Sequence, residues 1–207
     1  TRNTQHETRN TKHATRNTSM PPFPLILFTA PSGAGKTSIA HRVMKARPEM
    51  QFSVSATTRD PRAGEIDGSD YHFLSEDEFR HRIETGDLLE YEEVYPGRFY
   101  GTLKSEVDAK RESGPVLLDI DVKGAFNMKT IYGSEALVLF IAPPSMEELR
   151  RRLSQRGTED PETLRERLER AAMEMEYATR ADVVIVNDDL EVAVQETLDS
   201  IDQFMQS

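Results

Sequence analysis

A short glycine-rich segment constrains the fold of this chain more than any other feature. Residues 30–38 read Ala-Pro-Ser-Gly-Ala-Gly-Lys-Thr-Ser and follow an apolar run, Leu25–Ala30, that has the pattern of a buried strand. A helix is predicted over roughly Thr37–Ala46. At such a strand-to-helix turn, successive backbone N–H groups and the positive end of the helix bind a polyphosphate. The chain is therefore expected to form an α/β domain around a phosphate-binding loop.

Two side chains of this loop have expected chemical roles. Lys36 would reach the terminal phosphates of the bound polyphosphate, and the Thr37 hydroxyl would ligate Mg²⁺. Ala30 stands where the usual pattern has its first glycine, so backbone freedom is lost at that position. The alternative, an ordinary glycine-rich turn, is disfavoured by the strand before it, the helix after it and the Lys-Thr pair. The residues expected to line the site are Pro31, Ser32, Gly33, Ala34, Gly35, Lys36, Thr37 and Ser38.

Apolar runs alternate with helical patterns along the rest of the chain. Such alternation predicts a parallel sheet with helices on both faces. A capping box at Ser145 and Glu148 opens one predicted helix over 146–155, and a second is predicted over about 162–177. Five glycines break up short alternating segments within 57–103, which indicates an inserted lobe of mixed, partly antiparallel structure. The other predicted strands are Gln51–Ala56, Val116–Asp121, Ala136–Ala142 and Asp182–Val186.

The composition excludes several classes of protein. The chain carries 26 Lys and Arg against 36 Asp and Glu, and its net charge of −10 disfavours binding to nucleic acid. Its apolar runs are far shorter than the roughly 20 residues that cross a bilayer, so no membrane span is expected. There is no cysteine, which rules out disulfides and thiolate metal sites. With no secretory pattern at the N-terminus, the expected compartment is the cytoplasm.

The first nineteen residues differ in texture from the rest. The tetrad Thr-Arg-Asn-Thr recurs there every seven residues, and Ala14 is the only apolar side chain. A heptad coiled coil needs apolar seam positions, so we expect residues 1–19 to be a disordered tail outside the folded domain. A seven-nucleotide tandem repeat translated upstream of a start at Met20 would give the same period, and the tail is then not native. The alternative is a basic tail that binds an acidic partner.

Six motifs stand out between Pro24 and the C-terminus. They are Ala30–Ser38, Ser53-Val-Ser-Ala-Thr-Thr-Arg-Asp-Pro-Arg-Ala-Gly-Glu65, Gly68-x-Asp70-Tyr71-x-Phe73, Tyr100-Gly101-Thr102, Leu118-Asp119-Ile120-Asp121 and Ile185-Val186-Asn187-Asp188-Asp189. The most specific of them is the long polar string after the second predicted strand. Together the motifs resemble the guanylate kinase family, whose members phosphorylate GMP with ATP.

The resemblance implies a GMP site with two parts. The N–H donors of guanine pair best with carboxylates, and Glu90 and Asp121 are the candidates for this role. Ser55 and Thr102 would face the guanine carbonyl. The phosphate pairs best with cations and hydroxyls, which a second group of residues supplies. Taken singly, each arginine of that group is more often solvated surface, and Glu90 could be a solvated strand face. The residues expected to bind the phosphate are Arg59, Arg62, Tyr71 and Tyr100.

A further group of arginines surrounds the predicted break between the helices over 146–155 and about 162–177. The resemblance selects Arg152, Arg156 and Arg167 as cations of a mobile lid and places Asn187 near the adenine of ATP. The alternative for any one arginine is a solvated helix face, which we assign to Arg150, Arg151, Arg165 and Arg170. The expected division is a core (24–56, 104–150 and 178–207), a GMP-binding lobe (57–103) and a lid (about 151–177), all within a domain over 20–207.

The function implied is ATP-dependent phosphorylation of GMP and dGMP, with Mg²⁺ accompanying ATP. Lys36, Arg59, Arg152, Arg156 and Arg167 would neutralise charge on the transferred phosphoryl group, and the anionic acceptor needs no strong general base. The alternative is a catalytically weak, peptide-binding module of the same fold. A GTPase would want an Asn-Lys-x-Asp motif, which does not occur in the chain. Oligomeric state cannot be read from the sequence.

Overall fold

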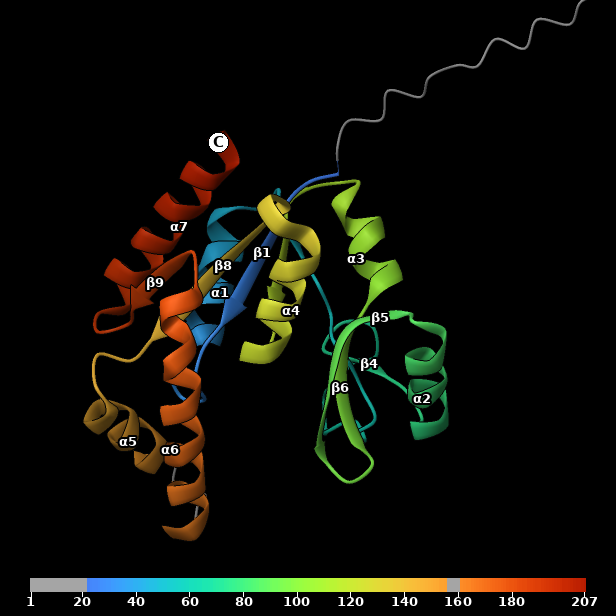
Figure 1. Cartoon of the computed structure of the whole chain (residues 1–207), viewed down its shortest axis with the longest axis horizontal. Helices are drawn as coiled ribbons and strands as arrows, with labels where there is room; N and C mark the ends of the chain where they lie inside the picture. The colour runs from blue at the N-terminus through green and yellow to red at the C-terminus, as the bar shows by residue number, and fades with distance from the viewer. Residues whose placement is uncertain (1–21, 156–160) are drawn as a thin grey trace, which may run out of the picture.

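The larger part of the chain is built on a five-stranded parallel sheet (Figure 1). The computed structural model describes residues 22–155 and 161–207, so the expected tail lies outside the described residues. The strand order is β2-β7-β1-β8-β9. This confirms the predicted α/β fold with a parallel core. The strands are β1 (Leu25–Thr29), β2 (Gln51–Phe52), β7 (Val116–Asp119), β8 (Ala136–Ala142) and β9 (Val183–Val186).

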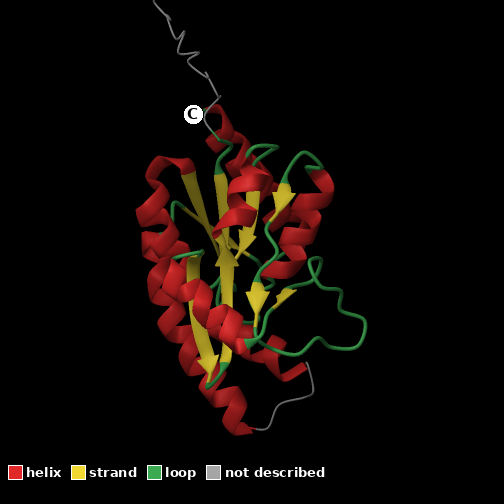
Figure 2. Cartoon of the chain, turned by 90° about the vertical axis from the view of Figure 1, so that its right-hand side faces the viewer, coloured by secondary structure: helices red, strands yellow, loops and turns green. Residues whose placement is uncertain are grey.

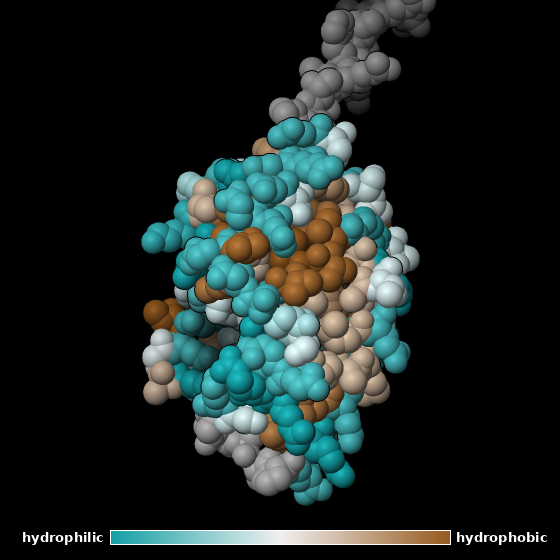
Figure 3. All heavy atoms as spheres, turned by 90° about the vertical axis from the view of Figure 1, so that its left-hand side faces the viewer, coloured by the Kyte–Doolittle hydropathy of each residue, from teal (hydrophilic) through white to brown (hydrophobic). Residues whose placement is uncertain are grey.

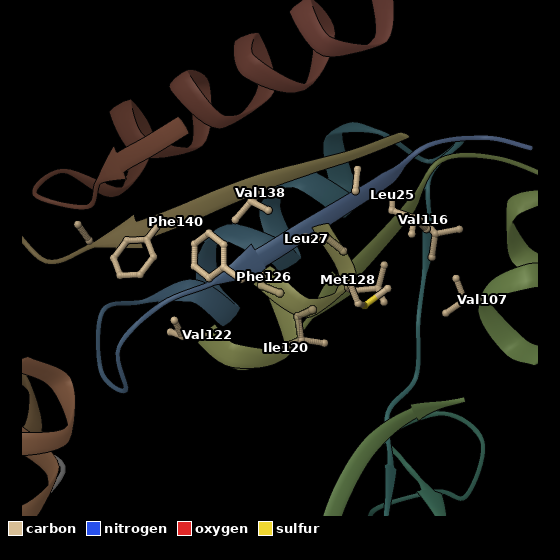
Figure 4. Packing of buried hydrophobic residues seen from close by; sticks show 14 residues of the cluster. Leu25, Leu27, Val107, Val116, Ile120, Val122, Phe126, Met128, Val138 and Phe140 are labelled. Carbon is tan, nitrogen blue, oxygen red and sulfur yellow. The ribbon is translucent and has the colours of Figure 1, made fainter. Parts of the chain in front are cut away.

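Helices cover both faces of this sheet, as Figure 2 shows from the side. Successive side chains of β1 point to opposite faces, so Leu25 and Leu27 join one buried cluster and Ile26 and Phe28 the other. The first cluster, drawn in Figure 4, packs under α3 (Lys104–Arg111) and α4 (Val122–Tyr132). The second packs under α1 (Lys36–Ala46) and α7 (Leu190–Gln206). Burial on both faces explains the continuous apolar strands.

A second, mixed sheet forms the inserted lobe, with the order β4-β3-β6-β5. It has its own small core, in which Phe79 stacks on Phe99 with ring centroids 5.3 Å apart. The register of β5 on β6 is antiparallel and places Glu90 opposite Thr102. The elements of the lobe are β3 (Ala56–Thr57), β4 (His72–Phe73), α2 (Glu76–Thr85), β5 (Leu88–Tyr95) and β6 (Arg98–Leu103).

The predicted strand Gln51–Ala56 was wrong, because the structure divides it between the two sheets. Its first two residues pair with β7 of the parallel sheet, whereas Ala56 pairs with β6 of the lobe. Between them the N–H of Val54 donates to the side chain of Glu106 on α3, at 2.7 Å. A side-chain carboxylate therefore takes the place of a strand partner where the chain crosses from core to lobe.

Two packed helices, α5 (Met146–Gln155) and α6 (Pro161–Met175), lie at the carboxyl end of the parallel sheet (Figure 1). Leu149, Leu153 and Ala171 are buried between them. The Ser145 hydroxyl accepts the Glu148 N–H at 3.1 Å, which is one of the two bonds of the predicted capping box, whereas the Glu148 carboxylate accepts from Arg151 and Arg152. A short 3₁₀ segment, η2 (Glu176–Arg180), then leads to β9, and another, η1 (Gly133–Glu135), precedes β8.

Apolar atoms gather on the face that carries β9 and α7 (Figure 3). β9 is an outer strand of the sheet, and its Val184 and Val186 are exposed, as is Val192 of α7. Within the described ranges, none of the helices has both the length and the apolar character that crossing a bilayer requires.

Candidate functional site

The loop between β1 and α1 has the backbone of an anion-binding turn. Gly33 and Gly35 have φ of +93° and +97°, a left-handed conformation that glycine adopts without strain. Positive φ occurs at no other residue type in the described chain, so Ala30 fits its place without the freedom of glycine. No side chain caps α1 at Gly35, which leaves the amide groups of the first turn to bind an anion.

Lys36 crosses from this loop to the end of β7. Its Nζ donates to the carbonyl oxygen of Ile120 at 2.9 Å and forms an ion pair with the carboxylate of Asp119. We had not predicted a role for Asp119, although it stands two residues before Asp121 at the carboxyl end of a buried strand, where ligands bind in such sheets. In this way the amine is held between the loop and the carboxyl end of β7.

The predicted guanine-binding carboxylates lie together. Glu90 of β5 accepts the Thr102 hydroxyl of β6 at 2.5 Å. Asp121 caps α4 by accepting the N–H of Gly124 at 2.9 Å. The sequence predicted a strand over Val116–Asp121 and did not predict this cap. A Cβ at Gly124 would lie 2.8 Å from Oε2 of Glu90, so glycine makes room for that carboxylate. Ser55 is partly buried beside this region, and its carbonyl accepts the N–H of His72 at 2.9 Å.

Burial raises the pKa of the Glu90 carboxyl to about 7, with the charge of Asp121 acting in the same direction. The Thr102 hydrogen bond opposes this shift, and so does the charge of Lys36. Near neutral pH, Glu90 is therefore a mixture of neutral and charged forms.

This shift predicts a pH dependence of stability. We expect the free energy of unfolding to fall as pH rises from 4.5 to about 7, because folded Glu90 retains a proton that the unfolded chain releases. Urea unfolding at several pH values measures the slope, which should be shallower in Glu90→Gln. Glu76→Gln, at an exposed ion pair of α2, should keep the wild-type slope. Equal slopes for wild type and Glu90→Gln would contradict the assignment.

The predicted phosphate-binding residues are brought together in part. Arg59 lies over the rings of Tyr71 and Phe73, at 5.0 and 5.6 Å from their centroids, and Tyr71 meets Tyr100 edge-on at 6.0 Å. The Glu65 carboxylate, and secondly the Tyr100 hydroxyl, raise the pKa of Arg59 above its usual value. Arg62 is exposed on the same loop. The Arg59 side chain is only 8% exposed, so it is no solvated surface residue.

The arginines of the helix pair reach different partners. Arg167 donates to the hydroxyl of Ser32 in the phosphate-binding loop at 2.8 Å, and Arg152 donates to the carbonyl oxygen of Asn187 at 2.9 Å. Arg156 lies outside the described residues. Arg170, predicted to be a solvated surface residue, is exposed and pairs with Glu174 of the same helix at 2.9 Å, and it also reaches Glu92 of the lobe at 3.3 Å. This contact joins segments far apart in the chain, so helical spacing alone did not reveal it.

Asn187 supports the phosphate-binding loop from within. Its side chain is buried, and its Nδ2 donates to the carbonyl oxygen of Ala34 at 2.7 Å. A Cβ on Gly35 would lie 2.2 Å from that nitrogen, so the close packing requires glycine. The predicted contact with adenine stays a prediction, because the Asn187 amide nitrogen is already engaged with the loop.

The oxygen donors beside Lys36 suit a magnesium ion. The Thr37 hydroxyl is exposed at the first turn of α1, and the Asp119 carboxylate faces the same lysine. Mg²⁺ takes oxygen ligands and usually only one or two from the protein, with phosphate oxygens and waters supplying the rest. The donor set therefore fits an ion bound together with a polyphosphate.

Comparisons with known proteins agree with this geometry. The family model described as guanylate kinase matches residues 23–204. The chain is 64% identical over 188 residues to the guanylate kinase of Salinibacter ruber, a match that covers 91% of this chain and 100% of that relative. It is 50% identical over 182 residues to the guanylate kinase of Bacteroides thetaiotaomicron, covering 87% and 89%. A crystal structure of guanylate kinase from Anaplasma phagocytophilum superposes with a TM-score of 0.70 at 31% identity, covering 90% of this chain and 88% of that one.

Proposed function

Since the chain belongs to the guanylate kinase family and is an enzyme that phosphorylates GMP to GDP, we propose that ATP is its phosphoryl donor and that both nucleotides bind around Lys36. The observation that carries this proposal is the position of Lys36. Its amine extends from the phosphate-binding loop to Asp119 and Ile120, and Asp121, a predicted guanine-binding carboxylate, follows directly in the chain. The groups proposed to bind the donor phosphates and the acceptor base are therefore both close to one lysine.

On the donor side, the first turn of α1 and Lys36 bind the triphosphate of ATP. Residues 31–38 wrap the phosphates, with Gly33 and Gly35 permitting the close approach of the backbone. Thr37 would hold Mg²⁺, and the carboxylate of Asp119 would supply a second oxygen donor. When bound, this ion screens the charge of the phosphates. Arg167 lies within reach of the same loop through Ser32.

On the acceptor side, Glu90 and Asp121 accept the N–H donors of guanine, while Thr102 and Ser55 face its carbonyl oxygen. Arg59, Arg62, Tyr71 and Tyr100 bind the phosphate of GMP. The base and the phosphate on which these groups would act are the same in dGMP, so we propose that dGMP is also a substrate.

The chemistry needs positioning and charge neutralisation rather than a base. The attacking oxygen of GMP is anionic at neutral pH, and the transferred group carries charge on its equatorial oxygens. Lys36 follows that group from donor to acceptor, and Arg59 fixes the acceptor phosphate. Arg152, Arg156 and Arg167 belong to a lid, 151–177, that excludes water when it closes over both nucleotides.

Chromatographic measurement of ADP tests the donor and the metal together, without coupling enzymes that need Mg²⁺ themselves. With ATP, GMP and Mg²⁺ we expect steady formation of ADP, and loss of more than about nine-tenths of the rate when excess EDTA removes the ion. Manganese added in excess over the EDTA should restore the activity, because it also prefers oxygen ligands. ADP formation that is unaffected by EDTA would refute the metal assignment. Binding of GMP without any ADP formation would favour the alternative, a catalytically weak binding module.

A further inference from the structure

One carboxylate organises both arginines of the phosphate-binding group. Oε1 of Glu65 accepts from Nη2 of Arg59 at 2.8 Å, and Oε2 accepts from Nη1 at 2.7 Å. Oε2 also accepts the backbone N–H of Arg62 at 2.6 Å, and the N–H of Glu65 returns to the carbonyl oxygen of Arg62 at 3.1 Å. Glu65 thus closes the turn that carries Arg62 and binds the side chain of Arg59 with two hydrogen bonds.

The pattern of these bonds decides which donors of Arg59 remain for a ligand. A guanidinium group has five N–H donors. Glu65 takes the edge formed by Nη1 and Nη2, and the carbonyl oxygen of Asp60 takes a second N–H of Nη1 at 2.8 Å. The other edge, formed by Nε and Nη2, can hold a phosphate with two parallel hydrogen bonds. Its Nε is buried and has no hydrogen-bond partner among the described residues.

An unpartnered buried donor costs free energy, so we expect its partner to arrive with the substrate, when the side chains that cover Nε move aside. The rings of Tyr71 and Phe73 pack against the same guanidinium and keep it from rotating. The pKa of Glu65 is lowered to about 2, first by the Arg59 hydrogen bonds and then by the Arg62 N–H, so its carboxylate stays charged at neutral pH. Arg59 is thus fixed before substrate binds.

We infer that Glu65 is a positioning residue for the acceptor phosphate, holding Arg59 so that its Nε–Nη2 edge faces the phosphate of GMP. This inference rests on the proposed function, because it takes the acceptor site as given. Preorganisation of this kind strengthens binding by removing the entropy cost of ordering a long side chain. Repulsion between Glu65 and the dianionic phosphate acts in the opposite direction, and a binding experiment decides which effect is larger.

The test compares GMP with guanosine, which has the same base and sugar but lacks the phosphate. Isothermal titration calorimetry measures both affinities for wild type, Glu65→Gln and the control Glu76→Gln, whose ion pair with Arg80 lies in the same lobe. We expect Glu65→Gln to weaken GMP binding about 10- to 100-fold, the loss typical of a charged hydrogen-bond pair, and to leave guanosine binding unchanged. Glu76→Gln should bind both ligands like wild type.

Other outcomes separate the competing explanations. Tighter GMP binding by Glu65→Gln would overturn the inference and make Glu65 a competitor for Arg59. Equal weakening of GMP and guanosine would overturn it in favour of a role in folding the loop. If Glu65→Gln unfolds at the assay temperature, Glu65→Asp provides the same comparison, because it keeps the charge but withdraws the carboxylate by one methylene. A wild-type protein that binds no GMP would contradict the proposed function itself.

A double-mutant cycle adds a readout that a structural role would not move. Lysine lacks the planar guanidinium group of arginine. In Arg59→Lys, Glu65 therefore cannot direct one edge of the side chain toward the phosphate. Adding Glu65→Gln to Arg59→Lys should then change GMP affinity less than about threefold. If the double variant instead lost GMP affinity by the product of the two single losses, Glu65 would act independently of Arg59.

Discussion

Replacing Lys36 with alanine should lower kcat by at least about a hundredfold, comparable to the loss of one preorganised donor at a site of developing charge. The amine of Lys36 reaches from the phosphate-binding loop to Ile120 and Asp119 at the end of β7, where we propose that it neutralises charge on the transferred group. Alanine leaves the backbone of the loop intact, so ATP should still bind. The loss should therefore appear more in kcat than in KM for ATP.

The control for this variant is Lys45→Ala, in the last turn of the same helix, where the side chain is exposed. It should retain wild-type kcat. The side chain of Asp119 is 24% exposed, so loss of its partner leaves a solvated charge and Lys36→Ala should stay folded, as thermal unfolding can verify. Near-normal kcat in a folded Lys36→Ala protein would remove the lysine from the mechanism.

The phosphate-binding loop could be predicted because all its determinants are local. A single stretch of sequence contains the apolar strand, the two glycines, Lys36 and the following helix. The position of each of these features limits where the next one can lie. The division of Gln51–Ala56 could not be predicted in the same way. An apolar run shows that a strand is covered, but not by which sheet, and the break depends on Glu106 from a helix far along the chain.

Several partners in the site escaped prediction for the same reason. Lys36 and Asp119 meet only because two parallel strands end side by side, and Arg170 meets Glu92 only because the helix pair and the lobe lie at one end of the sheet. Glu65 stood within the motif that carries the family resemblance. From the sequence alone, a carboxylate near two arginines is interpreted as a solvent-exposed charge. Only the structure shows that Glu65 is partly buried and accepts three hydrogen bonds.

The second large effect concerns the choice of base. We expect kcat/KM for GMP to exceed that for AMP by at least about 10⁴, because a site built to bond particular N–H groups strongly rejects a ligand that lacks them. Guanine offers two adjacent donors to Glu90 and Asp121, whereas adenine offers an acceptor at the corresponding ring nitrogen. Above the pKa of about 7, where Glu90 is charged, a carboxylate facing that acceptor would be left buried and unpaired, at a cost of several kcal/mol, so the two nucleotides are compared at about pH 8.

Glu90→Gln should reduce this preference about a hundredfold or more, since an amide presents both a donor and an acceptor and can match the edge of adenine. Asp121→Asn tests the second carboxylate while keeping an acceptor for the N–H of Gly124, so α4 retains its cap. Coupled assays with GMP and AMP give the two kcat/KM values for each variant, with Glu76→Gln as the control. If Glu90→Gln retained the full preference for GMP, Glu90 would be no more than a buried partner of Thr102, and base selection would have to reside elsewhere in the lobe.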